Sequence, residues 1–139
     1  MIPTEMTEHI NKWISRGNVT VVTLHATTLV LRHPQGHLNG YCWIEKSRVP
    51  KQFWDYSEIQ SDLDVHGGIT YSEPVGDYIM YGFDTAHYGD EENPLLRDPE
   101  EIKSMALHMR EEILRAVKLW CKETKAELDR VCPHYRESA

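Results

Sequence analysis

Two histidines and two aspartates have side chains suited to chemistry, and all four lie within residues 64–90. A carboxylate beside a histidine fixes the imidazole tautomer and makes the other ring nitrogen more basic. If the protein is an enzyme, the predicted catalytic residues are therefore His66, Asp84 and His87, with Asp84 orienting His66 as a general base.

A divalent metal ion is a second use for the same residues. Imidazole nitrogen and carboxylate oxygen both bind Zn²⁺, Mn²⁺ and similar ions, so the candidate ligands are His66, Asp84, His87 and Asp90. No H-E-x-x-H or C-x-x-C spacing specifies a known centre, which leaves the identity of the cofactor open. The structural alternative is that both aspartates bond turn backbone while the histidines satisfy buried carbonyl groups.

Residues 64–90 are predicted to form a β-hairpin, because residues 73–77 interrupt two runs of β-forming residues. If Ser72 pairs with Tyr78, one face of the hairpin is apolar and the other is polar. On the polar face the predicted opposed pairs are His66 with Asp84, Gly68 with Gly82, and Thr70 with Met80.

Glycines that face each other weaken a sheet, which suggests that something approaches the backbone closely at Gly68 and Gly82. If that is a small ligand, the glycines form the floor of its site and nearby polar side chains bind it. The predicted ligand-binding residues are then His66, Gly68, Thr70, Gly82, Asp84 and His87. The alternatives are a packed aromatic ring or a sharply twisted strand. A second polar group, His33, His37, Asn39 and Tyr41, surrounds an earlier turn and is a candidate opposite wall of the pocket.

Two helices and several strands must position these residues. Residues 4–16 have helical spacing and end at Gly17-Asn18, while Asp98 as N-cap and an apolar stripe up to Trp120 predict a long C-terminal helix. Residues 49–63 fit either a helix or an ordered loop. The other predicted strands are residues 19–24, 28–31 and 38–44.

Because the helices bracket the strands instead of alternating with them, the pattern predicts an α+β fold. The sheet would be antiparallel or mixed, with about five strands, and both helices would pack on it. The length of 139 residues suits one domain, which we place at residues 1–131. Residues 132–139 are predicted to be a flexible tail.

The composition limits the classes of partner. The formal charge of −7 disfavours a long nucleic acid, although a local cationic pocket can still bind a small anion. The sequence has no apolar run long enough to cross a bilayer and no signal-peptide pattern at Met1, so we expect a cytoplasmic protein without a membrane partner. A homo-oligomer is compatible with the sequence.

Three segments resemble a family of small, largely uncharacterised proteins of tailed phages and prophages. They are residues 36–41, 65–71 and 82–90, and the last two read V-H-G-G-I-T-Y and G-F-D-T-A-H-Y-G-D. The resemblance implies that the hairpin is the important region and that the protein acts in the host-cell cytoplasm. Thr85 stands where the family has a cysteine, which argues against an essential thiol.

The phage setting implies an accessory protein that counters host defence signalling. The first hypothesis is a protein that binds a small, nucleotide-like anion. The second is a hydrolase of phosphodiesterase type, which uses a metal or the His and Asp side chains directly. The third is an inhibitor of a host enzyme that docks through the aromatic residues Phe53, Trp54 and Tyr56.

Overall fold

The computed structural model describes residues 2–59, 63–87 and 89–131, so the predicted tail lies outside the described residues. Its centre is a five-stranded antiparallel sheet with the strand order β1-β2-β3-β5-β4. One helix precedes the sheet and a longer one follows it, which confirms the predicted α+β fold. The elements are α1 (Thr4–Gly17), β1 (Thr20–His25), β2 (Thr28–Arg32), β3 (Leu38–Glu45), β4 (Tyr71–Val75), β5 (Tyr78–Asp84) and α2 (Pro99–Val131).

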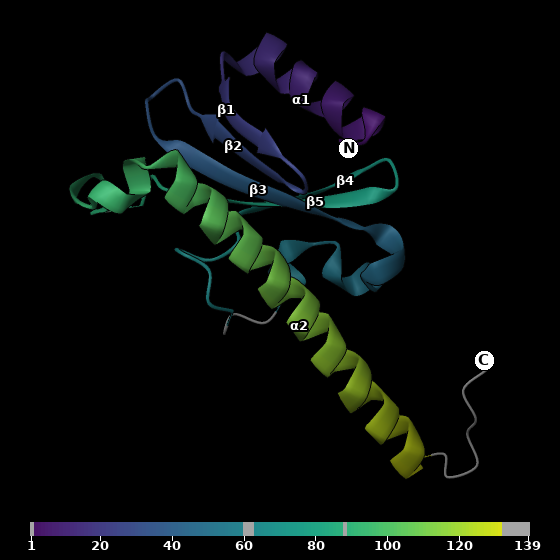
Figure 1. The fold of residues 1–139 in the computed structure, drawn as a ribbon. Helices are drawn as coiled ribbons and strands as arrows, with labels where there is room; N and C mark the ends of the chain where they lie inside the picture. The colour runs from purple at the N-terminus through teal and green to yellow at the C-terminus, as the bar shows by residue number, and fades with distance from the viewer. Residues whose placement is uncertain (1, 60–62, 88, 132–139) are drawn as a thin grey trace.

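The two helices cover opposite faces of the sheet (Figure 1). On the α1 side, Met6 and Ile10 pack with Trp43 and Met80 of the central strands. The second core lies under α2 and contains apolar side chains of β2, β3, β5 and α2. Among its buried members are Val30, Cys42, Ile44, Tyr81, Phe83, Ile102, Met109 and Ile113. Alternate residues of each strand thus serve the two cores, as the pleat of a sheet requires.

The predicted end of α1 and the predicted start of α2 are both confirmed. Asn18 adopts a left-handed conformation (φ 53°) and ends α1. The Asp98 carboxylate accepts a hydrogen bond from the backbone N–H of Glu100 (3.0 Å) and caps α2. With 33 residues, α2 is longer than the sheet is wide and extends past it (Figure 1). None of the described helices has the length and apolar character that crossing a bilayer requires.

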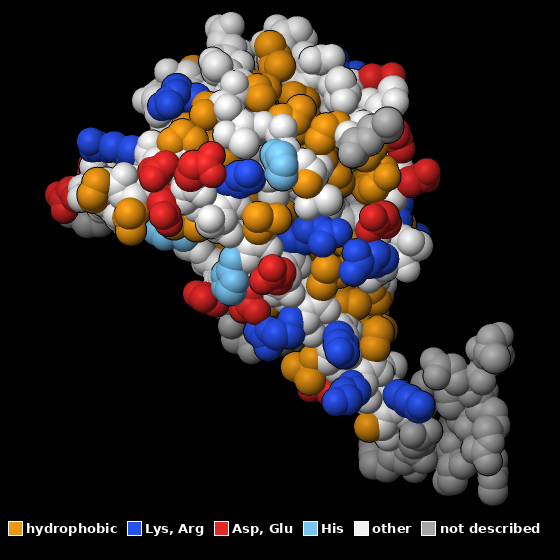
Figure 2. Space-filling view, viewed as in Figure 1, with side chains coloured by type: hydrophobic (Ala, Val, Ile, Leu, Met, Phe, Trp, Pro, Cys, Tyr) orange, Lys and Arg blue, Asp and Glu red, His pale blue; other side chains and the backbone are white. Residues whose placement is uncertain are grey.

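Charge is distributed unevenly along α2. Figure 2 shows acidic side chains over its first turns and Lys and Arg side chains along its C-terminal half. Glu100 and Glu101 lie in the first turn, where negative charge opposes the positive end of the helix dipole. The acidic excess of the whole chain is therefore compatible with local cationic surfaces.

The hairpin forms, but its predicted register is wrong. The turn consists of Gly76 and Asp77 alone, and Ser72 pairs with Tyr81 instead of Tyr78. Pro74, which we expected to break the strand, lies within β4 at the edge of the sheet, where a missing N–H is tolerated. Because side chains alternate between faces, this odd offset mixes the two predicted faces: Tyr71 now lies on the same face as Gly82 and Met80.

The segment 49–63, for which a helix and an ordered loop were both open, contains the short 3-10 helices η2 (Lys51–Phe53) and η3 (Tyr56–Glu58) joined by loop, after η1 (Lys46–Arg48). Residues 60–62 lie outside the described residues. Phe53 is buried and packs against the α2 core, and the Trp54 indole donates to the carbonyl of Val49 (3.0 Å). Of the aromatic residues predicted to dock on a host enzyme, Tyr56 alone is an exposed side chain. Trp54 is partly exposed, so docking through this segment stays a prediction that involves Trp54 and Tyr56 without Phe53.

Candidate functional site

The first of two turns that build the site carries His66. The carbonyl of Val65 accepts a hydrogen bond from the N–H of Gly68 (2.9 Å), which closes a four-residue turn in the loop before β4. Gly67 occupies the third position with φ 66°, a conformation that glycine adopts without steric cost. The His-Gly-Gly sequence is thus a turn that fixes the direction of the histidine.

The second turn follows the end of β5. The carbonyl of His87 accepts a hydrogen bond from the N–H of Asp90 (3.0 Å). Gly89, with φ 87° and ψ −10°, has a left-handed conformation that glycine adopts without steric cost. This turn brings the side chains of His87 and Asp90, three residues apart, back toward each other.

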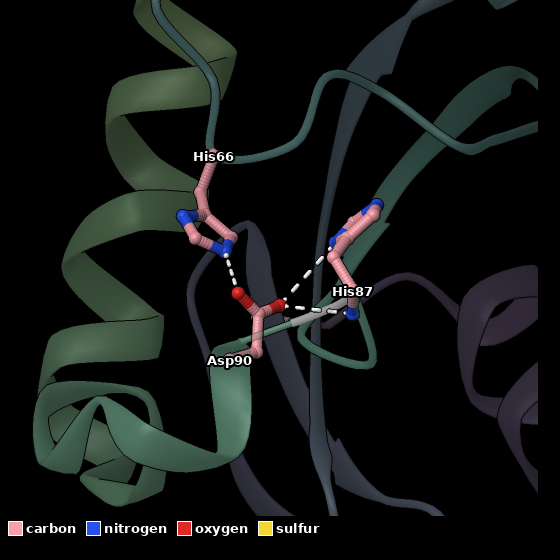
Figure 3. Close-up of side chains that lie close together, drawn as sticks. All are labelled: His66, His87 and Asp90. Atoms are coloured by element: carbon pink, nitrogen blue, oxygen red, sulfur yellow. Dashed lines mark hydrogen bonds and ion pairs between the residues drawn. The ribbon is translucent and has the colours of Figure 1, made fainter.

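The two turns meet at the carboxylate of Asp90 (Figure 3). Its Oδ1 lies 3.1 Å from Nε2 of His66, and its Oδ2 lies 3.3 Å from Nδ1 of His87. The same Oδ2 also accepts the backbone N–H of His87 (3.0 Å). Gly67 supports this arrangement, because a Cβ there would lie 2.4 Å from Cε1 of the His87 ring. The ring therefore rests directly on the first turn.

Asp84 pairs with a different histidine from the one we predicted. Its Oδ1 lies 3.5 Å from Nδ1 of His87 and accepts the backbone N–H of Ala86 (3.0 Å). The predicted His66–Asp84 pair is wrong, because His66 lies in a turn outside the strands and pairs with Asp90. The structural alternative is met in part: both aspartates bond turn backbone, but the histidine nitrogens face carboxylates instead of carbonyl groups.

The predicted floor of facing glycines does not exist. Gly82 pairs with Tyr71, and a Cβ at Gly82 would lie 2.5 Å from the ring of Tyr41. That ring packs against Trp13 and Tyr71, so the aromatic alternative is the correct reading of Gly82. Gly68 lies outside the strand with φ 80° and open space beside it. Thr70 is half-buried, and its N–H donates to the carbonyl of Gly82 (2.9 Å).

The three converging side chains differ in exposure. The Asp90 side chain is 9% exposed, compared with 30% for His66 and 37% for His87. Burial alone would raise the pKa of Asp90, but hydrogen bonds from the His66 side chain and the His87 backbone outweigh burial and hold the pKa below its usual range. Asp90 is therefore an ionised carboxylate at neutral pH, with both histidines reachable from solvent.

Helix α2 anchors the loop that carries His66. Oε1 of Glu112, a residue that is 9% exposed, accepts the backbone N–H of Asp64 (3.1 Å). Both oxygens also accept hydrogen bonds from Arg115 (2.7 and 3.2 Å). The hydrogen bonds from Arg115 have the largest effect, followed by that from the Asp64 backbone, and together they lower the pKa of Glu112 to about 2. Nothing in the sequence pattern indicated this contact, because the two partners are far apart in the chain.

The Glu112→Gln variant is expected to unfold more easily than the wild type at pH 7. A glutamate titrates near pH 4.3 in an unfolded chain and near 2 here, so its stabilising effect is complete above about pH 5. It is lost as pH falls toward 2, because the carboxylate then takes up a proton. Urea unfolding at pH 7, 4 and 3 should show a gap that narrows with acid. Glu111→Gln, at an exposed neighbour, is the control, and a gap that stays constant over this range would contradict the prediction.

Part of the turn between β2 and β3, which carries the second predicted polar group, lines a cleft. A cavity of about 550 Å³ lies between this turn and the residues after β5. His37 lines it, and the His33 ring stacks on His37 with ring centres 4.4 Å apart. Asn39 and Tyr41 are not in the lining. Two arginines that we did not single out, Arg32 and Arg97, do line it.

The side chains of His66, His87 and Asp90 could hold a metal ion, since one ligand atom from each lies within 4.8 Å of the others. The two histidines face different oxygens of Asp90, so a monodentate Asp90 would bind an ion through one of these oxygens together with a nitrogen from each histidine. Asp84 adjoins this cluster through His87 but is not part of it. Comparisons of the chain with protein-family models, curated proteins and solved structures gave no match, so function must be inferred from this site itself.

Proposed function

We propose that the protein binds a divalent transition-metal ion through His66, His87 and Asp90 and uses it to bind a small, nucleotide-like anion. The observation that carries this proposal is the meeting of three ligand atoms within 4.8 Å on two separate glycine-containing turns. The turns fix the side chains before any ion binds. A pre-organised ligand set lowers the entropic cost of binding.

The choice of an anion follows from charge. A divalent ion held by one carboxylate and two neutral imidazoles keeps a net positive charge. Three protein ligands also leave at least one coordination position for an outside group. Phosphate oxygens are hard anionic ligands that suit this position. The resemblance to phage proteins makes nucleotide messengers of host defence the first candidates.

Metal titration is the direct test. Metal-free protein would be titrated with Co²⁺, Zn²⁺ and Mn²⁺ by calorimetry, with the visible spectrum of Co²⁺ reporting its coordination number. We expect one ion per chain, with proton release as the histidines bind. Failure to bind any of the three ions would refute the metal site.

Ligand binding would be measured next on metal-loaded and EDTA-treated protein. The panel contains cyclic nucleotides and ADP-ribose-type nucleotides. We expect at least tenfold tighter binding to the loaded form. Equal affinity in the two forms would show that the ion plays no part in binding the anion.

Hydrolysis of the bound anion is the second candidate function. It is favoured by Asp84, whose carboxylate is only one-third exposed and lies 3.5 Å from Nδ1 of His87. In a phosphodiester hydrolysis, the oxygen of a water bonds to phosphorus, the P–O ester bond breaks, and the leaving alkoxide takes a proton. Asp84 would accept the proton of the water. Chromatography separates the two functions, because a binding protein returns its ligand intact on denaturation and an enzyme does not.

A further inference from the structure

The cleft of about 550 Å³ next to the proposed metal site has two walls, which come from distant parts of the chain. One wall is the end of β2 and the turn that follows it. The other contains Thr85 and Ala86 after β5 and the 3-10 segments near residues 90–97. Its volume lies within the range of pockets that bind small molecules, about 300–1,000 Å³. Asp90 belongs to both the cleft and the metal-capable cluster.

Two guanidinium groups line this cleft and are held by its own walls. Nη1 of Arg32 donates to the carbonyl of Gly36 (3.1 Å), and Nη2 of Arg97 donates to the carbonyl of Glu91. A guanidinium has five N–H donors, so each arginine keeps others for a ligand. Within the described part of the chain, neither forms an ion pair with a carboxylate.

The cleft also contains two carboxylates, and within the described residues neither forms an ion pair with an arginine. They are Asp90 and Glu91. Both oxygens of Asp90 are already engaged by the two histidines of the cluster. Glu91 is exposed and remains the one carboxylate in the lining without such a role. Two unpaired guanidinium groups at one cleft are unexpected in a chain with a formal charge of −7.

His37 adds a further polar group to the same wall. Burial, and then the neighbouring His33, lower its pKa. The Asp84 carboxylate raises the pKa in part, but the two lowering causes are larger, so the imidazole is mostly neutral at pH 7 and offers one N–H donor. A tetrahedral anion is the ligand that planar guanidinium forks and one imidazole N–H complement.

We propose that this cleft binds a phosphate group of the ligand through Arg32, Arg97 and His37. The inference deepens the proposed function, because it assigns the substrate class as phosphorylated small molecules with at least two anionic groups. One group would contact the metal ion near Asp90, and the other would contact the arginines on the far side of that residue. Arg97 and Arg32 approach from opposite walls and select a phosphate that lies between them.

The test measures the affinity of metal-free protein for pyrophosphate in the presence of EDTA, so that binding to the cleft is observed without a metal ion. The double variant Arg32→Gln/Arg97→Gln is expected to bind pyrophosphate at least about tenfold more weakly than the wild type, because one lost charge-assisted hydrogen bond accounts for roughly that factor. Both side chains are exposed, so the fold should persist. The matched control is Arg48→Gln, which removes an exposed arginine paired with Glu45 at 3.6 Å.

Failure of the cleft and failure of the metal site give different results. The cleft proposal is overturned if wild-type protein binds no pyrophosphate in EDTA, or if the double variant binds it as tightly as Arg48→Gln. Titration of the double variant with Co²⁺ reports the metal site separately, and we expect wild-type affinity there. A wild type that binds pyrophosphate but no Co²⁺ would keep the cleft and remove the metal ion from the proposed function.

Discussion

Replacing Asp90 with alanine is expected to lower the affinity of the protein for Co²⁺ or Zn²⁺ by more than about 100-fold, since loss of an outer-shell partner alone costs 10- to 100-fold. Within the cluster, Asp90 is the member whose side chain forms hydrogen bonds with both of the others. Its removal deletes the anionic ligand and also the acceptor that holds both imidazoles in place. The measurement is calorimetric titration of each variant.

Asp90→Asn separates the charge of this side chain from its shape. The amide keeps one oxygen, which can still accept the backbone N–H of His87 and preserve the turn. We expect a folded protein with strongly weakened metal binding. Asp90→Ala should in addition unfold at lower denaturant concentration, by about 1–3 kcal/mol, because the turn N–H loses its acceptor.

Asp64→Asn is the matched control for both variants. Asp64 also pairs with a histidine, His108, at 3.2 Å, but this carboxylate is 89% exposed and forms an ion pair with no second histidine among the described residues. We expect its metal affinity to equal that of the wild type. If Asp90→Asn bound Co²⁺ as tightly as this control, the ion would not be held at the cluster.

The fold could be predicted from local signals. Asp98 as N-cap, the left-handed Asn18 and the β-branched runs each determine a nearby backbone conformation, and the structure keeps them all. The hairpin register could not be predicted in the same way. It depends on whether Pro74 lies at the edge or in the middle of the sheet, which is a property of the whole strand order.

The candidate site could be predicted only in part, because local signals place its residues but do not give their partners. Sequence spacing brought His66, His87 and Asp90 into one region, because two short turns connect them to a single hairpin. It assigned the wrong partner to His66, since the pairing was derived from an assumed strand register. Contacts between distant segments, such as that of Glu112 with the Asp64 backbone, leave no periodic signal in the sequence.

Two neighbouring glycines permit a sharper test of whether the turns position the metal ligands. Gly67→Ala and Gly68→Ala both place a Cβ on a residue with positive φ, 66° and 80°. Each should therefore destabilise the fold by a similar amount, about 1–3 kcal/mol. Their surroundings differ: a Cβ at Gly67 would meet the His87 ring, whereas a Cβ at Gly68 has nothing within 4 Å.

Gly67→Ala is consequently expected to weaken Co²⁺ binding by roughly 10- to 100-fold, comparable to loss of an outer-shell partner. The ring of His87 would have to move by roughly 1 Å to relieve the contact, beyond the tolerance of about 0.5 Å for a pre-organised site. Gly68→Ala should bind Co²⁺ nearly as tightly as the wild type despite the same backbone strain. Equal weakening in both variants would mean that strain in the turn, and not the packing of Gly67 beneath His87, controls the site.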